Sequence, residues 1–411
     1  MAGALSHLRV LDLSRILAGP WASQLLADLG AEVIKIERPG VGDDTRHWGP
    51  PYLADESGQP TSEAAYYLGA NRNKRSVTID ITSPDGQRLV RDLAAKSDVL
   101  IENFKVGGLK QYGLDYASLR QVNPKLVYCS ITGFGQTGPY APRAGYDFLI
   151  QGMGGLMSLT GRPDEAEGGG PMKVGVALTD ILTGLYASNA VLAAIAHRDR
   201  DGFRAGDGQH IDLALLDVQV ACLANQAMNY LTSGKAPQRL GNAHPNIVPY
   251  QDFPTADGYM ILAIGNDAQF ARFCESAGQP ALATDPRFAT NAARVAHRNE
   301  LIPKLNALTV TRSTAEWIAR LESRAVPCGP INTVADVFDD PQVQARGMRV
   351  DLPHPLAGQV PQVGCPIRLS DTPVSYRNAP PLLGCDTDRV LAEVLGLSAD
   401  ALADLKAQKI V

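Results

Sequence analysis

The segment VGVALTDILTG, residues 174–184, contains the residue best suited to chemistry, Asp180. Its pattern predicts an apolar strand that ends at Thr179 and Asp180, with a long apolar helix beginning at once. A carboxylate at a helix N-terminus accepts backbone N–H bonds and lies at the positive end of the helix dipole, so we expect it to stay ionised. Such a group can simply cap the helix. It can also act as a nucleophile that forms a covalent intermediate, and the residues alone leave both interpretations open.

A glycine-rich segment, GFGQTG at 133–138, follows a predicted strand, KLVYCSIT. G-x-G-x-x-G after a strand is typical of a dinucleotide-binding turn, but that turn needs a helix that opens at the third glycine and holds the pyrophosphate. Pro139 and Pro142 follow instead, and they disfavour such a helix. No acidic residue closes a strand about twenty residues later. We therefore expect these glycines to let another bulky ligand approach the backbone.

Positive charge gathers near the ends of the first predicted strands, at Lys35, Arg38, Arg46, Arg72, Lys74 and Arg75. Ligands of open α/β sheets bind beyond the carboxyl ends of the strands, so these side chains could hold phosphates. The alternative is solvated surface charge. Arg38 is the strongest candidate for a phosphate contact, because it directly follows the predicted strand EVIKIE and precedes a Pro-Gly turn.

Tyr146 and Asp147 lie in the chain between the glycine segment and Asp180. A tyrosine in such a place can be buried with its hydroxyl group hydrogen-bonded. It can also be part of the site, and the sequence does not separate the two.

Strands and helices alternate along the first part of the chain. Predicted strands cover residues 8–14, 32–37, 76–81, 98–103 and 125–132. Pro20 marks the first position of one helix, and Ser83-Pro84 opens another. This alternation predicts an α/β fold with an open, mostly parallel, Rossmann-like sheet that is covered on both faces. Further helices are expected at 181–199, 211–234, 267–278, 297–325 and 386–406, with a hairpin at 253–265.

A chain of 411 residues is too long for one ordinary core. We expect a large α/β domain at residues 1–225 and a smaller α+β domain at 226–330. Residues 331–411 would then return to the large domain.

The composition excludes several classes of function. The net charge of −5 is spread along the chain, so neither a nucleic acid nor a membrane surface is an expected partner. No signal peptide and no run of eighteen apolar residues is present, so we expect no transmembrane helix. Six scattered cysteines without C-x-x-C spacing favour free thiols and a cytoplasmic location. No spacing suggests a metal site, and no permanently bound cofactor is expected.

With these residues in hand, the chain resembles CoA-transferase family III, the group that contains formyl-CoA transferase and carnitine CoA-transferase. The resemblance runs nearly end to end, through motifs in the same order: LDLSRILAGPWASQLLADLGAEVIKIERPGVGDDTR, NRNKRSVTIDI, IENFKVGGLKQYG, ITGFGQTGPY, GYDFLIQGMGGLMSLTG and VGVALTDILTG. It implies that Asp180 attacks the thioester of an acyl-CoA substrate and passes CoA to an acceptor acid through an aspartyl-CoA intermediate. Backbone N–H groups near Asp180 would stabilise the oxyanions.

The same resemblance implies a set of CoA contacts and an interlocked homodimer. The implied contacts are Leu17, Ala18, Arg38, Ile79, Thr82, Asn103, Phe104, Lys105, Gln111, Tyr146 and Asp147.

Two differences from formyl-CoA transferases narrow the range of expected substrates. Formyl-CoA transferases have a glutamine where this chain has Leu17, and their glycine-rich flap is replaced by the short AIGND at 263–267. Both point away from formate and oxalate, and we expect succinyl-CoA with a second dicarboxylate. One alternative is a 2-methylacyl-CoA racemase, but the histidine of its AGHD motif is Tyr146 here, and a tyrosine with a pKa of about 10 is a poor proton acceptor at neutral pH. The other is a non-catalytic acyl-CoA-binding homologue.

Overall fold

The computed structural model describes residues 3–200 and 206–411. The chain forms two compact units. The large unit combines Met1–Leu156, Val174–Met228 and Gln344–Val411, and the small unit combines Met157–Lys173 and Asn229–Val343. The last part of the chain therefore belongs to the same unit as the first.

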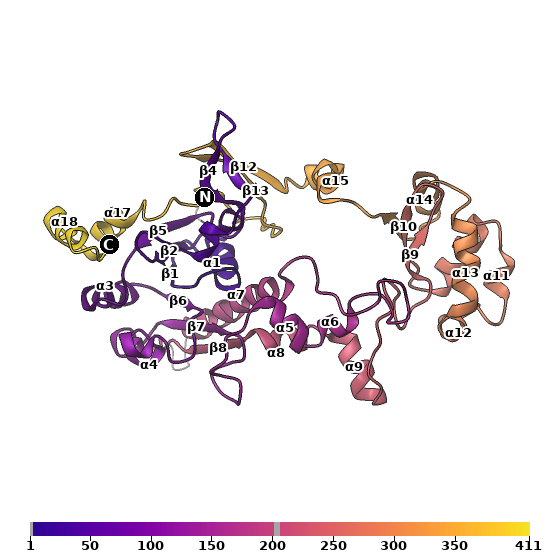
Figure 1. The fold of residues 1–411 in the computed structure, drawn as a ribbon, viewed down its shortest axis with the longest axis horizontal. Helices are drawn as coiled ribbons and strands as arrows, with labels where there is room; N and C mark the ends of the chain where they lie inside the picture. The colour runs from indigo at the N-terminus through magenta and orange to yellow at the C-terminus, as the bar shows by residue number, and fades with distance from the viewer. Residues whose placement is uncertain (1–2, 201–205) are drawn as a thin grey trace. The chain divides into compact units, whose positions relative to one another are not determined.

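A six-stranded sheet forms the centre of the large unit, with the strand order β5-β2-β1-β6-β7-β8 (Figure 1). All neighbouring strands are parallel. The strands are β1 (Arg9–Asp12), β2 (Glu32–Glu37), β5 (Lys74–Thr78), β6 (Val99–Glu102), β7 (Val127–Thr132) and β8 (His210–Ala214). The predicted α/β fold with a parallel sheet is confirmed.

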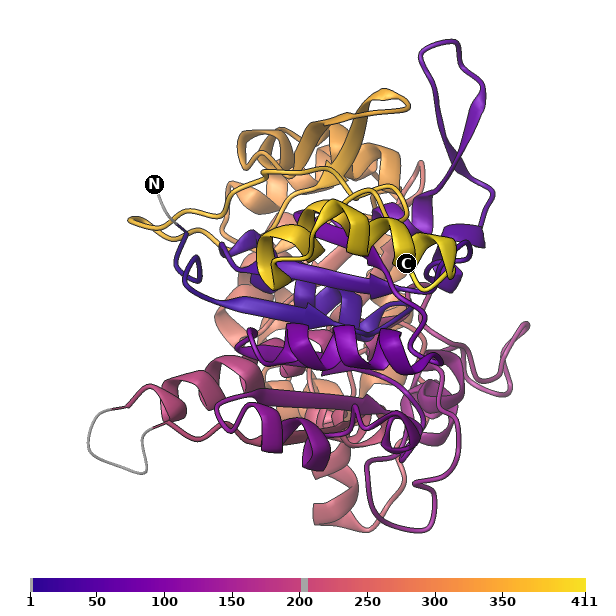
Figure 2. The same cartoon turned by 90° about the vertical axis from the view of Figure 1, so that its left-hand side faces the viewer.

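Two hydrophobic cores cover the two faces of this sheet, because successive strand residues point to opposite sides. On one face, Leu11, Ile34 and Leu100 pack against the helices α3 (Pro84–Ala94), α4 (Tyr116–Val122), α17 (Thr387–Leu395) and α18 (Ala399–Ala407). On the other face, Val10 and Val33 pack against α1 (Ala18–Asp28) and α7 (Leu178–Arg198). Figure 2 shows the C-terminal helices, in yellow, beside the indigo strands.

Several predicted elements differ from the structure. No strand forms at 174–179, because residues 174–177 are irregular and α7 begins at Leu178. The predicted helix 211–234 is β8 followed by α8 (Leu215–Ala221) and α9 (Ala224–Ser233), so its first residues complete the sheet. Pro20 is the third residue of α1, not the first. The predicted closing helix is divided into α17 and α18 at Gly396, which takes the left-handed conformation.

The sequence predicts no membrane-spanning helix, and α7 is the helix that bears on this prediction. By length and apolar composition it could cross a membrane. It packs against α1, α8 and β7, and Ala187 and Val191 are completely buried. The buried face of α7 therefore serves the core of the large unit, although Leu185 and Tyr186 are exposed.

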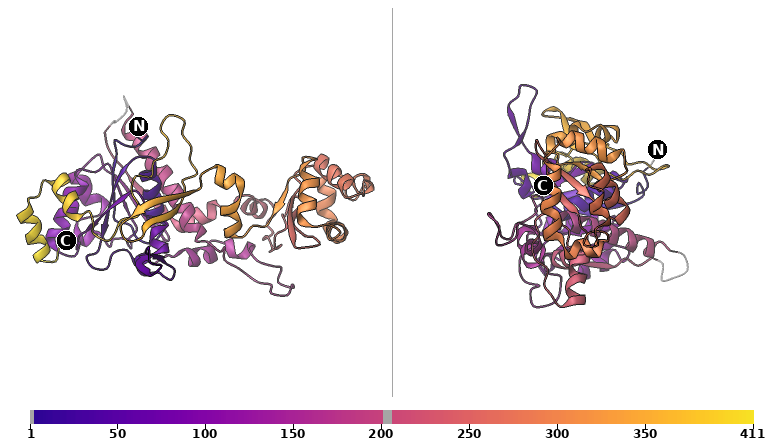
Figure 3. Two further views of the ribbon diagram at one scale, coloured as in Figure 1. Left: turned by 90° about the horizontal axis from the view of Figure 1, so that it is seen from above. Right: turned by 90° about the vertical axis from the view of Figure 1, so that its right-hand side faces the viewer.

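The small unit has a three-stranded antiparallel sheet, in which β9 (Tyr250–Pro254) and β10 (Tyr259–Ala263) form the predicted hairpin and β11 (Cys328–Pro330) pairs with β10. Its core joins Phe253 and Met260 to Phe273 and Trp317 of the helices α10 (Asp267–Ser276) and α14 (Thr314–Glu322). The helix α13 (Arg298–Thr309) also contributes, so the segment 297–325 is two helices instead of one (Figure 3).

The remaining elements are short. They are η1 (Asp44–His47), β3 (Tyr52–Ala54), β4 (Pro60–Ala64), α2 (Ala65–Leu68), η2 (Lys110–Tyr112), α5 (Asp147–Met153), α6 (Leu156–Leu159), α11 (Ala281–Thr284), α12 (Asn291–Ala296), α15 (Val334–Asp339), α16 (Pro341–Ala345), β12 (Arg349–His354) and β13 (Gly358–Val363). All six cysteines are free thiols, as predicted.

Candidate active site

A cavity of about 1090 Å³ lies at the carboxyl ends of the parallel strands, wholly within the large unit. This is where open α/β sheets bind ligands. The residues predicted for the site that line it are Leu17, Ala18, Arg38, Ile79, Thr82, Asn103, Phe104, Lys105, Gln111, Tyr146 and Asp180. Asp147 is not part of the lining. The structure therefore places together residues that are up to 163 positions apart, from Leu17 to Asp180.

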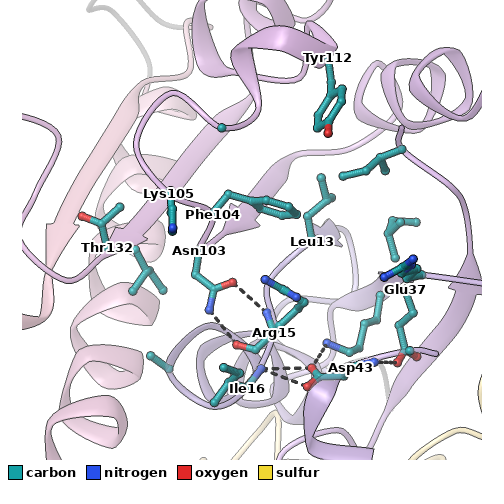
Figure 4. Close-up of a pocket in the computed structure, with 18 of the residues that line it drawn as sticks. Leu13, Arg15, Ile16, Glu37, Asp43, Asn103, Phe104, Lys105, Tyr112 and Thr132 are labelled. Atoms are coloured by element: carbon teal, nitrogen blue, oxygen red, sulfur yellow. Dashed lines mark hydrogen bonds and ion pairs between the residues drawn. The ribbon is translucent and has the colours of Figure 1, made fainter. Parts of the chain in front are cut away.

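The turn between β1 and α1 forms one wall of the cavity and contains a strained residue. Ile16 has a φ of 71°, a left-handed conformation that is unfavourable for a β-branched side chain. Its N–H group donates to both carboxylate oxygens of Asp43, at 3.2 Å each. The Lys35 ammonium group donates to Asp43 at 2.9 Å and to the Ser14 carbonyl oxygen at 2.8 Å. Figure 4 shows Asp43 at the centre of these bonds, which hold the strained turn in place.

Burial by itself would raise the pKa of Asp43, but the charge of Lys35 and the hydrogen bonds from Thr45 outweigh it and lower the pKa to about 2. Asp43 is therefore ionised at neutral pH. Lys35 is completely buried in this ion pair. It supports the turn and is not free to bind a phosphate group.

Asn103 clamps the same turn from the end of β6. Its amide oxygen accepts the N–H of Arg15 at 2.9 Å, and its amide nitrogen donates to the Arg15 carbonyl oxygen at 2.7 Å. Figure 4 shows these two bonds side by side. The Arg15 guanidinium group lies 5.6 Å from the centre of the Phe104 ring, a cation–π contact. Asn103 thus positions the backbone that presents Leu17 and Ala18 to the cavity.

The basic cluster predicted to hold phosphates is largely structural. The Arg46 guanidinium group donates two bonds of 2.8 Å to Glu37, and Arg72 pairs with Asp28. Lys74 is completely buried beside Asp12, and Arg75 bridges Glu32 and Glu393. The phosphate interpretation is therefore wrong for these four cations, because each already has a carboxylate partner and none lines the cavity. Arg38 does line it, with an exposed side chain.

Asp180 is the third residue of α7 and lies in its first turn. The N-cap position is Ala177, whose side chain cannot cap, so the interpretation of Asp180 as the cap is wrong. Asp147 from α5 supplies the cap instead. One of its carboxylate oxygens accepts the N–H groups of Thr179 at 2.8 Å and Asp180 at 3.2 Å. The other accepts the Gln151 amide at 2.7 Å.

This arrangement changes the electrostatics expected for Asp180. Its carboxylate is half-buried, and burial together with the negative charge of Asp147 raises its pKa to about 7. The expectation that the helix terminus keeps Asp180 ionised is wrong, because Asp147 takes up the nearby N–H groups. The same two groups are then not free to stabilise an oxyanion. A carboxylate with a pKa near 7 is more basic than an ordinary one, and part of it is still ionised at neutral pH.

The glycine segment reaches the cavity at Gly133. A Cβ atom on Gly133 would lie 2.5 Å from the Cα of Gly145, so neither position has space for a side chain. Both glycines line the cavity, as do Tyr146 and Asp180. No helix opens at Gly138, and the next helix, α5, begins at Asp147. The segment therefore lacks the helix that a dinucleotide-binding turn requires, as the sequence indicates.

Two groups of residues near the site are not predicted from the sequence, because no motif or spacing singles them out. Burial raises the pKa of Tyr66, and the negative charges of Asp180 and Asp147 raise it further. Trp48 packs edge-on against Tyr66 at 5.1 Å. Lys406 and Lys409, from the end of the chain, also line the cavity. Within residues 3–200 and 206–411, no cluster of three or more histidine, cysteine or acidic side chains could hold a metal ion.

The parallel sheet and its strand-end cavity, with Asp180 in the lining, are typical of a ligand-binding α/β domain. The chain belongs to CoA-transferase family III, whose model matches residues 5–387. It is 56% identical to a succinate–glutarate CoA-transferase from Agrobacterium fabrum, over 95% of both chains. It is 43% identical to a human succinyl-CoA:glutarate CoA-transferase, over 99% of this chain and 90% of that one.

The crystal structure of a CaiB/BaiF family protein from Brucella suis gives a TM-score of 0.83 at 53% identity, with 96% of this chain and 100% of that chain covered. The resemblance seen in the sequence motifs is thereby confirmed. The protein is a CoA-transferase, and CoA thioesters are the substrates of its family.

Proposed function

We propose that the enzyme transfers CoA from succinyl-CoA to glutarate, with Asp180 as the covalent nucleophile. The observation that carries the proposal is the position of Asp180, which lines the same cavity as the strand-end loops that would hold CoA. The choice of acids follows from the relatives at 56% and 43% identity, whose names pair succinate with glutarate.

The reaction proceeds through four acyl transfers without net loss of thioester energy. An ionised Asp180 oxygen attacks the thioester carbon, the C–S bond breaks, and a succinyl–aspartyl anhydride and CoA thiolate form. The thiolate attacks the aspartyl carbonyl carbon and releases succinate, which leaves an aspartyl-CoA thioester. Glutarate attacks that thioester and releases the thiolate again. The thiolate then attacks the glutaryl carbon, and the Asp180 carboxylate is regenerated.

Both acids must occupy the same place in turn, because each forms an anhydride with Asp180. Succinate and glutarate differ by one methylene group, and a single methylene changes binding in an apolar pocket by only about 10- to 200-fold. The proposed site therefore accepts dicarboxylates that differ by one methylene group. Discrimination against other acids would depend on the second carboxylate, the one that does not react with Asp180.

We further propose that the enzyme works as a homodimer. Apolar side chains are exposed on three neighbouring helices of the large unit. They are Tyr146 just before α5, Phe148, Leu149 and Met153 on α5, Leu185 and Tyr186 on α7, and Val220 on α8. An exposed apolar patch of this kind is typical of an interface.

An acceptor screen tests the proposed reaction. The enzyme is mixed with succinyl-CoA and a panel of mono- and dicarboxylic acids, and mass detection identifies new CoA thioesters. We expect glutaryl-CoA as the main product, with none from Asp180→Ala although that variant still binds CoA. Absence of glutaryl-CoA would contradict the proposed acceptor. Deuterium that enters the α-carbon of a 2-methylacyl-CoA without any acceptor acid would favour racemisation instead.

A further inference from the structure

Two carboxylates with opposite surroundings lie at the start of α7. In the part of the chain that the structure describes, no hydrogen-bond donor contacts the carboxylate of Asp180. The carboxylate of Asp147 accepts three bonds, from the N–H groups of Thr179 and Asp180 and from the Gln151 amide. Donors favour the charged form of a carboxyl group, and burial without donors favours the neutral form. The surroundings therefore give the two groups different roles.

Gln151 is the partner that holds the second oxygen of Asp147. The two residues are four positions apart on α5, so their side chains lie on the same face of the helix. The Gln151 amide nitrogen donates to that oxygen at 2.7 Å. Gln151 is completely buried, so its amide group cannot exchange this bond for one with water.

The irregular chain before α7 determines how the Gln151 amide group is turned. Its oxygen accepts the Val174 N–H at 2.9 Å, and in an amide side chain only the oxygen can accept. The nitrogen must therefore face Asp147, and it also contacts the Val176 carbonyl oxygen at 3.4 Å. A protonated Asp147 would have no acceptor for its own hydrogen among these donors. The bond from Gln151 therefore favours the charged form of Asp147.

Asp147 is the charge that acts on Asp180. Burial and this charge are the two causes of the raised pKa of Asp180. α5 packs against α7 and α8, and α7 also packs against α1, β7 and β8 (Figure 1). Tyr66 of α2 is near enough for both charges to raise its pKa. The other titratable and charged groups on the packed helices and strands are Asp28, Tyr128, Cys129, Tyr186, His197, Arg198, His210, Asp212 and Asp217.

We propose that Gln151 is a positioning residue for the nucleophile, because it keeps Asp147 as the charged member of the carboxylate pair and leaves Asp180 as the member that takes up and releases the proton. This rests on the proposed function, in which an ionised Asp180 attacks the thioester. Gln151 acts through Asp147, and the irregular segment at 174–176 acts through Gln151.

The test follows the protonation of Asp180 without turnover. A water-soluble carbodiimide couples an amine to carboxyl groups in their protonated form, and mass spectrometry of the peptide that contains Asp180 gives the labelled fraction at each pH. Gln151→Met keeps the length of the side chain but removes the donor. We expect the midpoint of labelling at Asp180 to fall by roughly 0.5–1 pH unit, because the charge of Asp147 is no longer held beside it. The midpoint of the kcat/KM profile should fall with it.

Two controls separate positioning from a structural role. Gln219 on α8 is also buried, and it accepts the Thr179 hydroxyl group at 2.7 Å. Gln219→Met therefore removes a second buried amide group at the start of α7, but not the donor to Asp147, and it should leave the midpoint unchanged. In the Asp147→Asn background, Gln151→Met should cause no further shift, because the charge that it positions is absent.

An unchanged midpoint in Gln151→Met, or an equal shift in the Asp147→Asn background, would overturn the proposal. If Gln151→Met does not fold, Gln151→Asn takes its place, since its shorter amide cannot reach both Asp147 and Val174. A smaller shift in the same direction is then expected, and an unmoved midpoint would again overturn the proposal. Failure of the proposed function is a separate result: Asp180 would titrate as described, but CoA would be transferred without modification of Asp180.

Discussion

At the scale of single residues, the pair of Asp147 and Asp180 determines how the site is charged. Asp147 accepts the two N–H groups at the start of α7 and adds a negative charge beside Asp180. The neighbouring carboxylate therefore makes Asp180 more basic, and it would keep the helix terminus capped when Asp180 becomes a neutral anhydride or thioester in the proposed reaction. The resemblance implies that Asp147 contacts CoA. In the structure Asp147 is not part of the cavity lining, and it binds the backbone N–H groups of Thr179 and Asp180.

The pH dependence of turnover follows from the pKa of Asp180, which burial and Asp147 raise from 3.8 to about 7. Below this pH the group is protonated and cannot attack, so kcat/KM for succinyl-CoA should fall about tenfold per pH unit. Above it, kcat/KM should level off. Rate measurements in buffers of constant ionic strength check this profile. A level profile from about pH 5.5 to pH 8 would contradict the raised pKa.

A matched variant tests the role of Asp147 in the same profile. Asp147→Asn keeps an oxygen that can accept the two N–H groups but removes the charge. The midpoint of the profile should therefore move to lower pH, while the variant remains folded. The shift should be partial, because burial is the larger cause of the raised pKa. An unmoved midpoint would show that Asp147 does not act through its charge.

At the scale of elements, the strained turn between β1 and α1 depends on a side chain from β6. Asn103→Ala removes both hydrogen bonds to the Arg15 backbone. Each such bond contributes about 0.5–1.5 kcal/mol, so we expect KM for succinyl-CoA to rise roughly tenfold as the turn loosens. Asn103→Asp retains the acceptor for the Arg15 N–H. Its KM for succinyl-CoA should therefore lie between the values of the wild type and Asn103→Ala. A wild-type KM in Asn103→Ala would show that Ile16 keeps its conformation without this clamp.

The buried ion pair of Arg72 and Asp28 joins the start of β5 to α1, and Arg72 also donates to the Val363 carbonyl oxygen at 2.8 Å. Removal of one partner leaves the other charge buried and unpaired, at a cost of about 3–5 kcal/mol. Arg72→Leu should therefore lower the free energy of unfolding by that amount, measured by urea denaturation. Arg88→Leu, whose ion pairs are exposed, should change it by less than about 1 kcal/mol. A raised KM for CoA without lost stability would restore the phosphate interpretation for Arg72.

At the scale of the whole molecule, the sequence predicted the sheet well and the charge pairing poorly. Apolar runs such as EVIKIE mark strands that are buried on both faces, and this signal is local. The segment 211–234 has apolar residues at both strand and helix spacing, so its pattern predicts a helix where β8 forms. The apolar residues around Val176 predict a buried strand, but Val176 is 54% exposed and no strand forms there.

The partners of the buried cations could not be predicted, because they come from distant parts of the chain. Arg72 and Asp28 are 44 positions apart, and no periodicity connects them. Lys409 joins Arg38 in the cavity only because the last residues dock against the sheet. The site residues that follow individual strands were predictable, since parallel strands bring their carboxyl ends to one edge.

The proposed homodimer predicts a sedimenting species of twice the chain mass of 43.8 kDa. A charge in the exposed apolar patch should weaken this association, so Tyr186→Glu should shift sedimentation equilibrium toward the monomer. Val122→Glu, in an exposed apolar residue of α4 away from the patch, should leave the dimer intact. A wild-type protein that sediments as a monomer at micromolar concentration would contradict the proposal.

The central claim is that CoA passes through Asp180, and direct trapping of the intermediate tests it most closely. The enzyme is mixed with succinyl-CoA without acceptor, quenched with acid and digested, and the peptide that contains Asp180 is weighed by mass spectrometry. The account predicts a CoA thioester on Asp180, which hydroxylamine converts to a hydroxamate and glutarate discharges before the quench. An unmodified Asp180, in an enzyme that turns over under the same conditions, would contradict it.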